Sequence, residues 1–237
     1  MPAGPDPGPE QRGVALVTGA AQGLGHETAL RLAADGFAVA VNDISDPAAG
    51  PAMAEAVARQ LGPVQVLVAN AAAMAMSPFL ESKPGEWWHQ IDVNLSGHFR
   101  LIQAVIPGMR ARGHGRIVII SSGWGVIGHP NATAYAASKA GLIALTKGLG
   151  RELGPQGILT NAIAPSFIDT EQLRVDADDA GITLGEMRQR YREQIPIRQL
   201  ASPDDIAAAV AFLAGPGSGA VIGQVLQPNG GVTRTRA

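Results

Sequence analysis

Short, uninterrupted apolar runs alternate along this chain with longer segments of helical periodicity. The apolar runs predict strands at Val14–Thr18, Ala38–Asn42, Val64–Val68, Arg116–Ile120, Leu159–Ile163 and Gln224–Gln227. The segments between them predict helices at Leu24–Asp35, Ala52–Leu61, Trp87–Arg112, Thr133–Leu153 and Asp204–Ala214. Strands that are apolar on both faces belong in a parallel sheet that helices cover on both sides. The pattern therefore predicts an α/β fold with a doubly wound parallel sheet.

The 237 residues are expected to form one domain. No repeat or linker interrupts residues 13–237, whereas residues 1–12 are rich in proline and glycine and predict a disordered leader. The polar segment 171–196 is long for a connection, which favours a helical lid or substrate loop. The long helix Trp87–Arg112 is expected to be disturbed near Pro107, because proline has no amide donor.

Composition argues against several classes of function. Charged residues make up 16% of the chain and the net charge is -2, so nothing electrostatic favours a nucleic acid or an acidic membrane partner. The chain has no cysteine, which excludes disulfides and thiolate sites and fits a reducing cytoplasm. Its five histidines show no metal-ligand spacing, and no apolar run is long enough to predict a membrane span.

A glycine-rich turn follows the first predicted strand and opens the first predicted helix. Gly19, Gly23 and Gly25 follow a G-x-x-x-G-x-G spacing, which lets backbone N–H groups approach a pyrophosphate at a helix N-terminus. A turn without a ligand is the alternative. Asp43 follows the second strand, where a carboxylate can accept both hydroxyls of an adenine ribose, although a simple strand-end turn is also possible. Because the turn has no basic residue and Gln22 stands where one could lie, NAD is favoured over NADP.

Tyr135 and Lys139 are four positions apart in the second long predicted helix, and Ser122 precedes Tyr135 by thirteen positions. Residues i and i+4 share a helix face, so the lysine ammonium is expected beside the phenol. A nearby positive charge lowers a tyrosine pKa from its ordinary value of about 10, which suits proton exchange near neutral pH. A solvated polar pair is the alternative for these two residues considered alone.

In combination these residues resemble the short-chain dehydrogenase/reductase family, over nearly all of the chain from Val14 to Val232. The motifs that carry the resemblance, in the family's order, are TGAAQGLG, VLVANAA, Asn94 in DVNL, Ser122 in ISS, and YAASK. The resemblance implies a Rossmann-like catalytic domain and an NAD-dependent oxidoreductase acting on the CH–OH group of a small molecule. It also implies a homo-oligomer, a tetramer or a dimer.

The resemblance assigns roles to individual residues. Tyr135 is implied as the general acid/base, Lys139 as the residue that lowers its pKa and binds the nicotinamide ribose, and Ser122 as the donor to the substrate oxygen. Asn94 is implied to hold a water that links Lys139 to solvent, and an asparagine inside a helix that simply bonds to backbone is the alternative. The residues implied in cofactor binding are Gly19, Gln22, Gly23, Leu24, Gly25, Asp43, Asn70, Tyr135, Lys139, Pro165, Ile168 and Thr170. No metal ligand is implied.

The chain departs from the family between Asp43 and Val64, which are only twenty-one positions apart. A parallel crossover takes a dozen or more residues, so one helix fits there and the family's additional strand does not. We therefore expect the edge strand and helix usually found in this interval to be missing, which leaves the adenine side open. Ala72, where the family has glycine, adds a methyl group close to the expected cofactor path.

Other residues leave alternatives. Trp124, Phe167 and Met74–Met76 either line an apolar substrate cleft or pack the lid, and Trp87–Trp88 is expected to anchor the long helix against the body. The arginines of the lid are expected on a solvated face. Two other functions compete with the oxidoreductase: a non-catalytic nucleotide sensor on the same fold, and a lyase similar to the halohydrin dehalogenases. Lys139 and the intact glycine turn disfavour the lyase.

Overall fold

The structure is a computed structural model that describes residues 12–43 and 48–233. Its centre is one six-stranded sheet with the strand order β2-β1-β3-β4-β5-β6, and every pair of neighbouring strands is parallel. The strands are β1 Val14–Thr18, β2 Ala38–Asn42, β3 Val64–Ala69, β4 Gly115–Ile120, β5 Ile158–Ile163 and β6 Val225–Leu226. The doubly wound parallel sheet predicted from the sequence is confirmed. The predicted leader, residues 1–12, lies outside the described residues except for Arg12.

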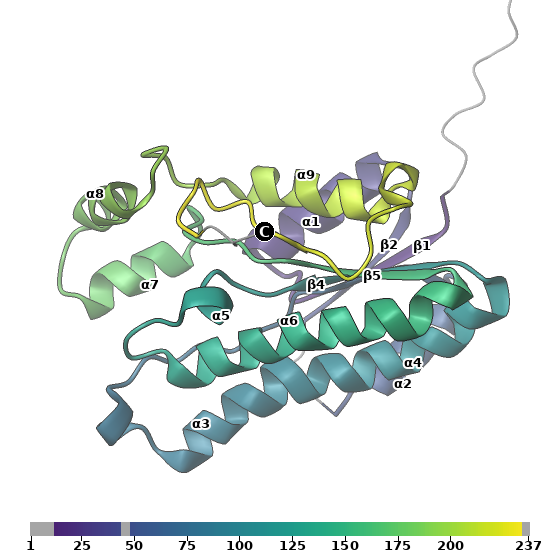
Figure 1. Cartoon of the computed structure of the whole chain (residues 1–237), viewed down its shortest axis with the longest axis horizontal. Coiled ribbons are helices and arrows are strands. Elements are labelled where there is room, and N and C mark those ends of the chain that lie inside the picture. Colours follow the sequence, from purple (N-terminus) through teal and green to yellow (C-terminus); the bar gives the residue numbers. More distant parts are fainter. Residues whose placement is uncertain (1–11, 44–47, 234–237) are drawn as a thin grey trace, which may run out of the picture.

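Helices cover both faces of the sheet (Figure 1). They are α1 Gly23–Ala34, α2 Gly50–Gln60, α3 Pro84–Ile91, α4 Gly97–Arg112, α5 Trp124–Ile127, α6 Thr133–Leu153, α7 Gln172–Asp179, α8 Leu184–Gln194 and α9 Pro203–Ala214. One core cluster packs α2, α4 and α6 against the sheet, and a second packs α1 and α9 against the opposite face. Strands β1 and β4 are buried along their whole length because both of their faces are covered.

The interval after β2 is short, as expected. Strand β2 pairs only with β1 among the described residues, and α2 leads directly to β3. No additional strand occurs in the described part of this interval, while residues 44–47 lie outside the description. Strand β2 is therefore the edge of the sheet, and the side chain of Val41 is 63% exposed there.

The long helix is continuous from Pro84 to Arg112, but its disturbance does not lie at Pro107. Pro107 sits inside α4 on an exposed face, as does Gln103 one turn earlier, so water can satisfy the carbonyl that loses its amide donor. The irregular turn is instead η2, a π-helix at Asp92–Ser96. A π turn bonds residues five apart and is frequent at functional sites.

The polar segment after β5 forms two helices, α7 and α8, which stand at one end of the sheet beside α5 (Figure 1). Helix α8 begins with a capping box in which Thr183 and Glu186 bond reciprocally. The two helices enclose a small core that includes Leu173, Ala177 and Met187. The predicted lid is therefore a packed helical pair, which we call the lid below.

Candidate active site

The glycine-rich turn joins β1 to α1 and is shaped for close backbone approach. Gly19 has a φ of +63°, and a Cβ atom on Gly25 would lie 2.1 Å from the Gly19 carbonyl oxygen. Asn70 holds the turn, because its Nδ2 donates to the carbonyl oxygens of Thr18 at 2.9 Å and Gly19 at 3.0 Å. Helix α1 begins at Gly23 without a side-chain cap, so its first amides are available to a ligand.

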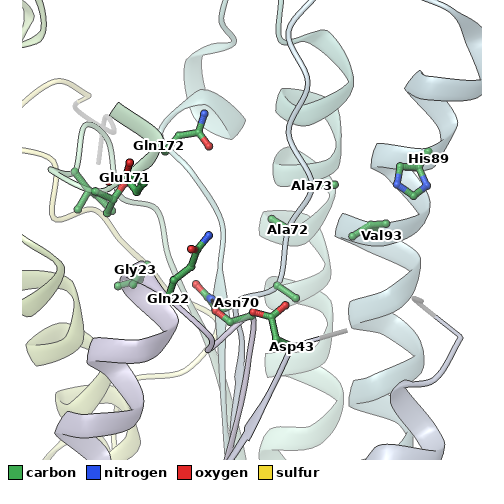
Figure 2. A pocket seen from close by; sticks show the side chains of 15 residues that line it. Gln22, Gly23, Asp43, Asn70, Ala72, Ala73, His89, Val93, Glu171 and Gln172 are labelled. Atoms are coloured by element: carbon green, nitrogen blue, oxygen red, sulfur yellow. Dashed lines mark hydrogen bonds between the residues drawn. The ribbon is translucent and has the colours of Figure 1, made fainter. Parts of the chain in front are cut away.

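A cavity of about 530 Å³ opens over this turn. Figure 2 shows Asp43 and Asn70 at its base, with His89 and Val93 at one side and Glu171 and Gln172 at the other. The predicted cofactor residues that line it are Gly19, Gln22, Gly23, Leu24, Asp43, Asn70, Ile168 and Thr170. Gly25 and Pro165 are buried behind the surface and do not line it. We refer to this space as the dinucleotide cavity.

The dinucleotide cavity has features that fit such a ligand. A Cβ atom on Gly19 or Gly25 would clash with nearby backbone atoms, so only glycine allows the turn to be this tight. A tight turn of this kind lets backbone amides approach phosphate oxygens. Asp43 is exposed at the base of the cavity, where one carboxylate oxygen accepts the Ala21 N–H at 3.1 Å. No lysine or arginine is among the described residues of its lining. Ala72 lines the cavity, as the departure from the family's glycine predicts.

Ser122, Tyr135 and Lys139 come together beside this cavity. The Tyr135 hydroxyl is hydrogen bonded to Ser122, and the Lys139 Nζ lies 5.4 Å from the centroid of the Tyr135 ring. Lys139 is 1% exposed, and its Nζ donates to the Ile120 carbonyl oxygen at 2.8 Å. The Ser121 hydroxyl is engaged by the backbone, since it donates to the Lys139 carbonyl oxygen at 2.8 Å. Ser122 therefore stays the predicted serine of the site.

The pKa values correct one expectation. Burial raises the pKa of Tyr135 to about 12, although the hydrogen bond from Ser122 opposes this rise. Burial also lowers the pKa of Lys139 to about 7. The expected lowering of the Tyr135 pKa by a permanent ammonium is wrong for this structure, because Lys139 is itself too buried to keep its charge throughout the neutral range. Tyr135 is consequently protonated at neutral pH.

Asn94 lies in the π turn and is fully buried. Its Oδ1 accepts the Ala73 N–H at 2.7 Å, while its Nδ2 donates to the Ala73 carbonyl oxygen at 2.9 Å and to the Ser138 hydroxyl at 3.1 Å. Both amide hydrogens are thus engaged with the protein. Asn94 ties the chain after β3 to the helix that carries Tyr135 and Lys139. A water-holding role for Asn94 stays a prediction.

His98 is a buried residue of this region that sequence reasoning missed. Its Nε2 lies 3.0 Å from the Ala69 carbonyl oxygen at the end of β3. Burial first, and then the charge of Lys139, lower the pKa of His98 to about 3. His98 is therefore a neutral hydrogen-bonding residue of the core near Lys139. Nothing in the local sequence distinguishes it from the exposed histidines. In the described part of the chain, no group of acidic residues and histidines could hold a metal ion.

Ser122 and Tyr135 line a second cavity, of about 110 Å³. We call it the inner chamber. Its walls include Trp124, Phe167 and Met74, while Phe167 also packs against the lid core and stacks on Tyr191 with 4.2 Å between ring centroids. A substrate role for these residues stays a prediction. Ile168, Thr170 and Gln172 line both this chamber and the dinucleotide cavity.

A third space, of about 860 Å³, lies between the lid helices and residues 76–78 and 127–131 of the body, and we call it the outer cleft. Met76 and His129 line it, and the His129 ring stacks on Trp124 with 3.9 Å between centroids. Two other expectations need correction. Trp88 is 63% exposed and so does not anchor the long helix, whereas Trp87 is half-buried. Arg188 pairs with Asp169 at 3.0 Å instead of being only solvated.

Comparison with known proteins agrees with this architecture. Residues 42–233 match the sequence model of the family described as enoyl-(acyl carrier protein) reductase, and residues 13–49 match that of short chain dehydrogenase. The chain is 37% identical to nodulation protein G of Azospirillum brasilense, with 92% of this chain and 97% of the relative covered. It is 36% identical to the 3-oxoacyl-(acyl-carrier-protein) reductase FabG of Escherichia coli, with 92% and 96% covered.

Solved structures are also similar. The aldohexose dehydrogenase of Thermoplasma acidophilum superposes with a TM-score of 0.88 at 30% identity, covering 93% of each chain. A levodione reductase superposes with a TM-score of 0.88 at 28% identity, covering 92% of this chain and 96% of the other. Within residues 12–43 and 48–233, we find no helix with the length and apolar character that a bilayer crossing requires.

Proposed function

Because this chain belongs to the short-chain dehydrogenase/reductase family, we propose that it exchanges a hydride between NAD(H) and a secondary alcohol or ketone, with Tyr135 as general acid and base. Members of this oxidoreductase family bind a nicotinamide cofactor, which supplies or accepts the hydride when bound. The observation that carries the proposal is the junction of two cavities. Ile168 and Thr170 line both, so a molecule in the dinucleotide cavity lies next to the chamber that holds Ser122 and Tyr135.

The residues of the inner chamber suit carbonyl reduction. Ser122 can donate a hydrogen bond to the carbonyl oxygen, where negative charge develops. Tyr135, protonated at neutral pH because burial raises its pKa to about 12, can donate the proton that completes the alcohol. Lys139, with a pKa of about 7, exists in both protonation states near neutral pH and can return a proton toward Tyr135. In the oxidative direction the same steps run in reverse: the neutral amine of Lys139 takes the Tyr135 proton, and the resulting phenolate then accepts the hydroxyl proton.

Asp43 supports NAD as the preferred dinucleotide. Asp43 lines the base of the cavity, where its carboxylate can accept ribose hydroxyls and repel a 2′-phosphate. No described lysine or arginine of the lining could neutralise that phosphate, and residues 44–47 contain no basic side chain.

A homo-oligomer, a tetramer or a dimer, is the state we propose. Small exposed residues follow one face of α6 at helical spacing: Ala137, Ala140, Ala144 and Gly148. Such a face allows close helix contact between subunits. Mass measurement in solution tests this proposal, and a monomer at micromolar concentration contradicts it.

A coupled binding and turnover assay tests the function. Purified protein is titrated with NADH, and its oxidation is then followed with a panel of ketones for the wild type and Tyr135→Phe. Turnover that the substitution removes, with NADH binding retained, supports the proposal. NADH binding without turnover on any ketone, and without a difference between the two proteins, favours the nucleotide sensor instead.

A further inference from the structure

The inner chamber and the outer cleft adjoin at Asp176 and Tyr191, the two residues that line both spaces. Building on the proposed function, we infer that Tyr191 and Asp176 form a partition that selects the substrate. The favoured substrate is a ketone with a flat apolar group next to the carbonyl and an uncharged, hydrogen-bonding extension that passes the partition into the outer cleft. An anionic extension is excluded.

The partition is held by contacts from both lid helices. The Tyr191 hydroxyl, from α8, donates to Asp176 Oδ2 at 3.0 Å, and Gln172 Nε2 donates to Asp176 Oδ1 at 3.0 Å. The Tyr191 ring also stacks on Phe167, with 4.2 Å between centroids and 22° between planes. Burial, together with the charge of Asp176, raises the pKa of Tyr191, so its hydroxyl remains a donor.

The lid itself is fixed to the body. Its buried core includes Leu173, Met187 and Ile195. Arg188 donates two hydrogen bonds to the Asp169 carboxylate, from Nε at 3.1 Å and from Nη2 at 3.0 Å. A bidentate pair restrains orientation more than a single contact does. Passage between the two spaces therefore depends on the Tyr191 side chain, which packs against the edge of the lid core and stacks on Phe167.

The two spaces differ in chemistry. Around the reacting hydroxyls, the inner chamber presents the rings of Trp124, Phe167 and Tyr191, which suit a flat apolar group. The outer cleft is lined by the carboxylates of Asp176 and Asp179 against the single guanidinium of Arg190 among the described residues. Excess carboxylate repels an anion but accepts hydrogen bonds from hydroxyl groups.

Three ketones test the inference: acetophenone, and acetophenone with a para hydroxybutyl or a para carboxypropyl chain. The kcat/KM of the wild type is expected to be about 10-fold higher for the hydroxybutyl than for the carboxypropyl ketone. Asp176→Asn, which is nearly isosteric, is expected to reduce that ratio about 5-fold. Asp178→Asn is the matched control, because Asp178 is exposed on the same helix and lines neither space. It is expected to leave the ratio unchanged.

Substitution of Tyr191 tests the partition itself. Tyr191→Ala is expected to raise kcat/KM for both extended ketones relative to acetophenone, on the order of 10-fold. Tyr191→Phe keeps the ring stack and is expected to give a smaller rise. Retained NADH binding in each variant verifies folding.

Two outcomes would contradict the partition but leave the proposed function standing. In the first, the wild type reduces acetophenone, but neither the Tyr191 nor the Asp176 substitutions change the ratios of kcat/KM. In the second, the enzyme reduces only aliphatic ketones. If no ketone of any class is reduced, the proposed function fails as well.

Discussion

The catalytic side and the adenosine side of the site are built in contrasting ways. On the catalytic side, Asn94 is 0% and Lys139 1% exposed, and buried hydrogen bonds hold both in place. On the adenosine side, β2 is an exposed sheet edge, and Asp43 is exposed with a hydrogen bond to one backbone amide. The proposed catalytic groups are thus fixed by buried hydrogen bonds, while the adenosine half of a bound dinucleotide would meet an exposed sheet edge and the exposed Asp43. Substitutions should therefore affect turnover strongly on one side and binding moderately on the other.

The largest effect is expected from Tyr135→Phe. Loss of the hydroxyl removes the proton donor, so kcat should fall by about 10³-fold in ketone reduction. The dissociation constant of NADH should stay within a factor of about 2, since the ring remains. Steady-state kinetics and a fluorescence titration measure the two quantities. Equal losses in kcat and in NADH affinity would contradict the view that the catalytic side controls turnover without affecting cofactor binding.

Gly25→Ala should damage the turn that both sides share. The added Cβ meets the Gly19 carbonyl oxygen at 2.1 Å and Asn70 Nδ2 at 2.7 Å, so the backbone must move. We expect the free energy of unfolding to fall by about 1–3 kcal/mol. NADH affinity should fall about 10-fold or more. Gly85→Ala, where the Cβ would meet nothing within 4 Å, is the control and should cost no stability. Unchanged urea unfolding of Gly25→Ala would contradict the turn geometry.

The stability of the catalytic side should depend on pH through His98. Its folded pKa of about 3 lies below its ordinary value of 6.5 because of burial and then the charge of Lys139. Between these values the unfolded chain binds a proton that the folded chain does not, so stability is fully present above pH 6.5 and is lost as pH falls. From pH 6.5 to 5 the loss is about 2 kcal/mol.

Urea unfolding at these two pH values measures the loss in the wild type and in His98→Gln. The variant should lose less stability over this interval than the wild type. Exposed His26 provides the control, and His26→Gln should keep the wild-type dependence. Lys139, with a folded pKa of about 7, is protonated in both states at the low end of this interval and adds little slope there. An identical pH dependence in all three proteins would show that His98 is not responsible.

The smallest effect is expected at Asp43, on the adenosine side. Asp43→Asn removes the charge that disfavours a 2′-phosphate, and the ratio of kcat/KM for NADPH to that for NADH should rise about 10-fold. The control Asp178→Asn, on the lid, should leave this ratio unchanged. A wild type that already prefers NADPH would contradict the role of Asp43 in selecting NADH.

Much of this architecture follows from local sequence. The sheet, the glycine turn and the shared face of Tyr135 and Lys139 depend on patterns within a few residues, and each was predictable. The π turn at Asp92–Ser96 was not predictable from local sequence. Its Asn94 bonds to Ala73, twenty-one positions earlier, and this bond forms only when the two segments pack together. The raised pKa of Tyr135 likewise depends on burial in the folded chain, which outweighs the opposing hydrogen bond from Ser122.

The remaining surprises also come from tertiary packing. His89 and Val93 enter the dinucleotide cavity because the long helix passes beside the end of β3, and no local pattern marks them. The bond between Tyr191 and Asp176 depends on how the two lid helices pair. Helical periodicity predicts that such a lid forms, but not which of its side chains face the substrate.

Isotope transfer tests the central claim most directly. The wild type is supplied with acetophenone and NADH that carries deuterium at its transferable ring position, and the alcohol is analysed by mass spectrometry. The account predicts an alcohol with one deuterium on the carbinol carbon, formed far more slowly by Tyr135→Phe. Bound NADH with no deuterated alcohol from this or any other ketone would contradict it.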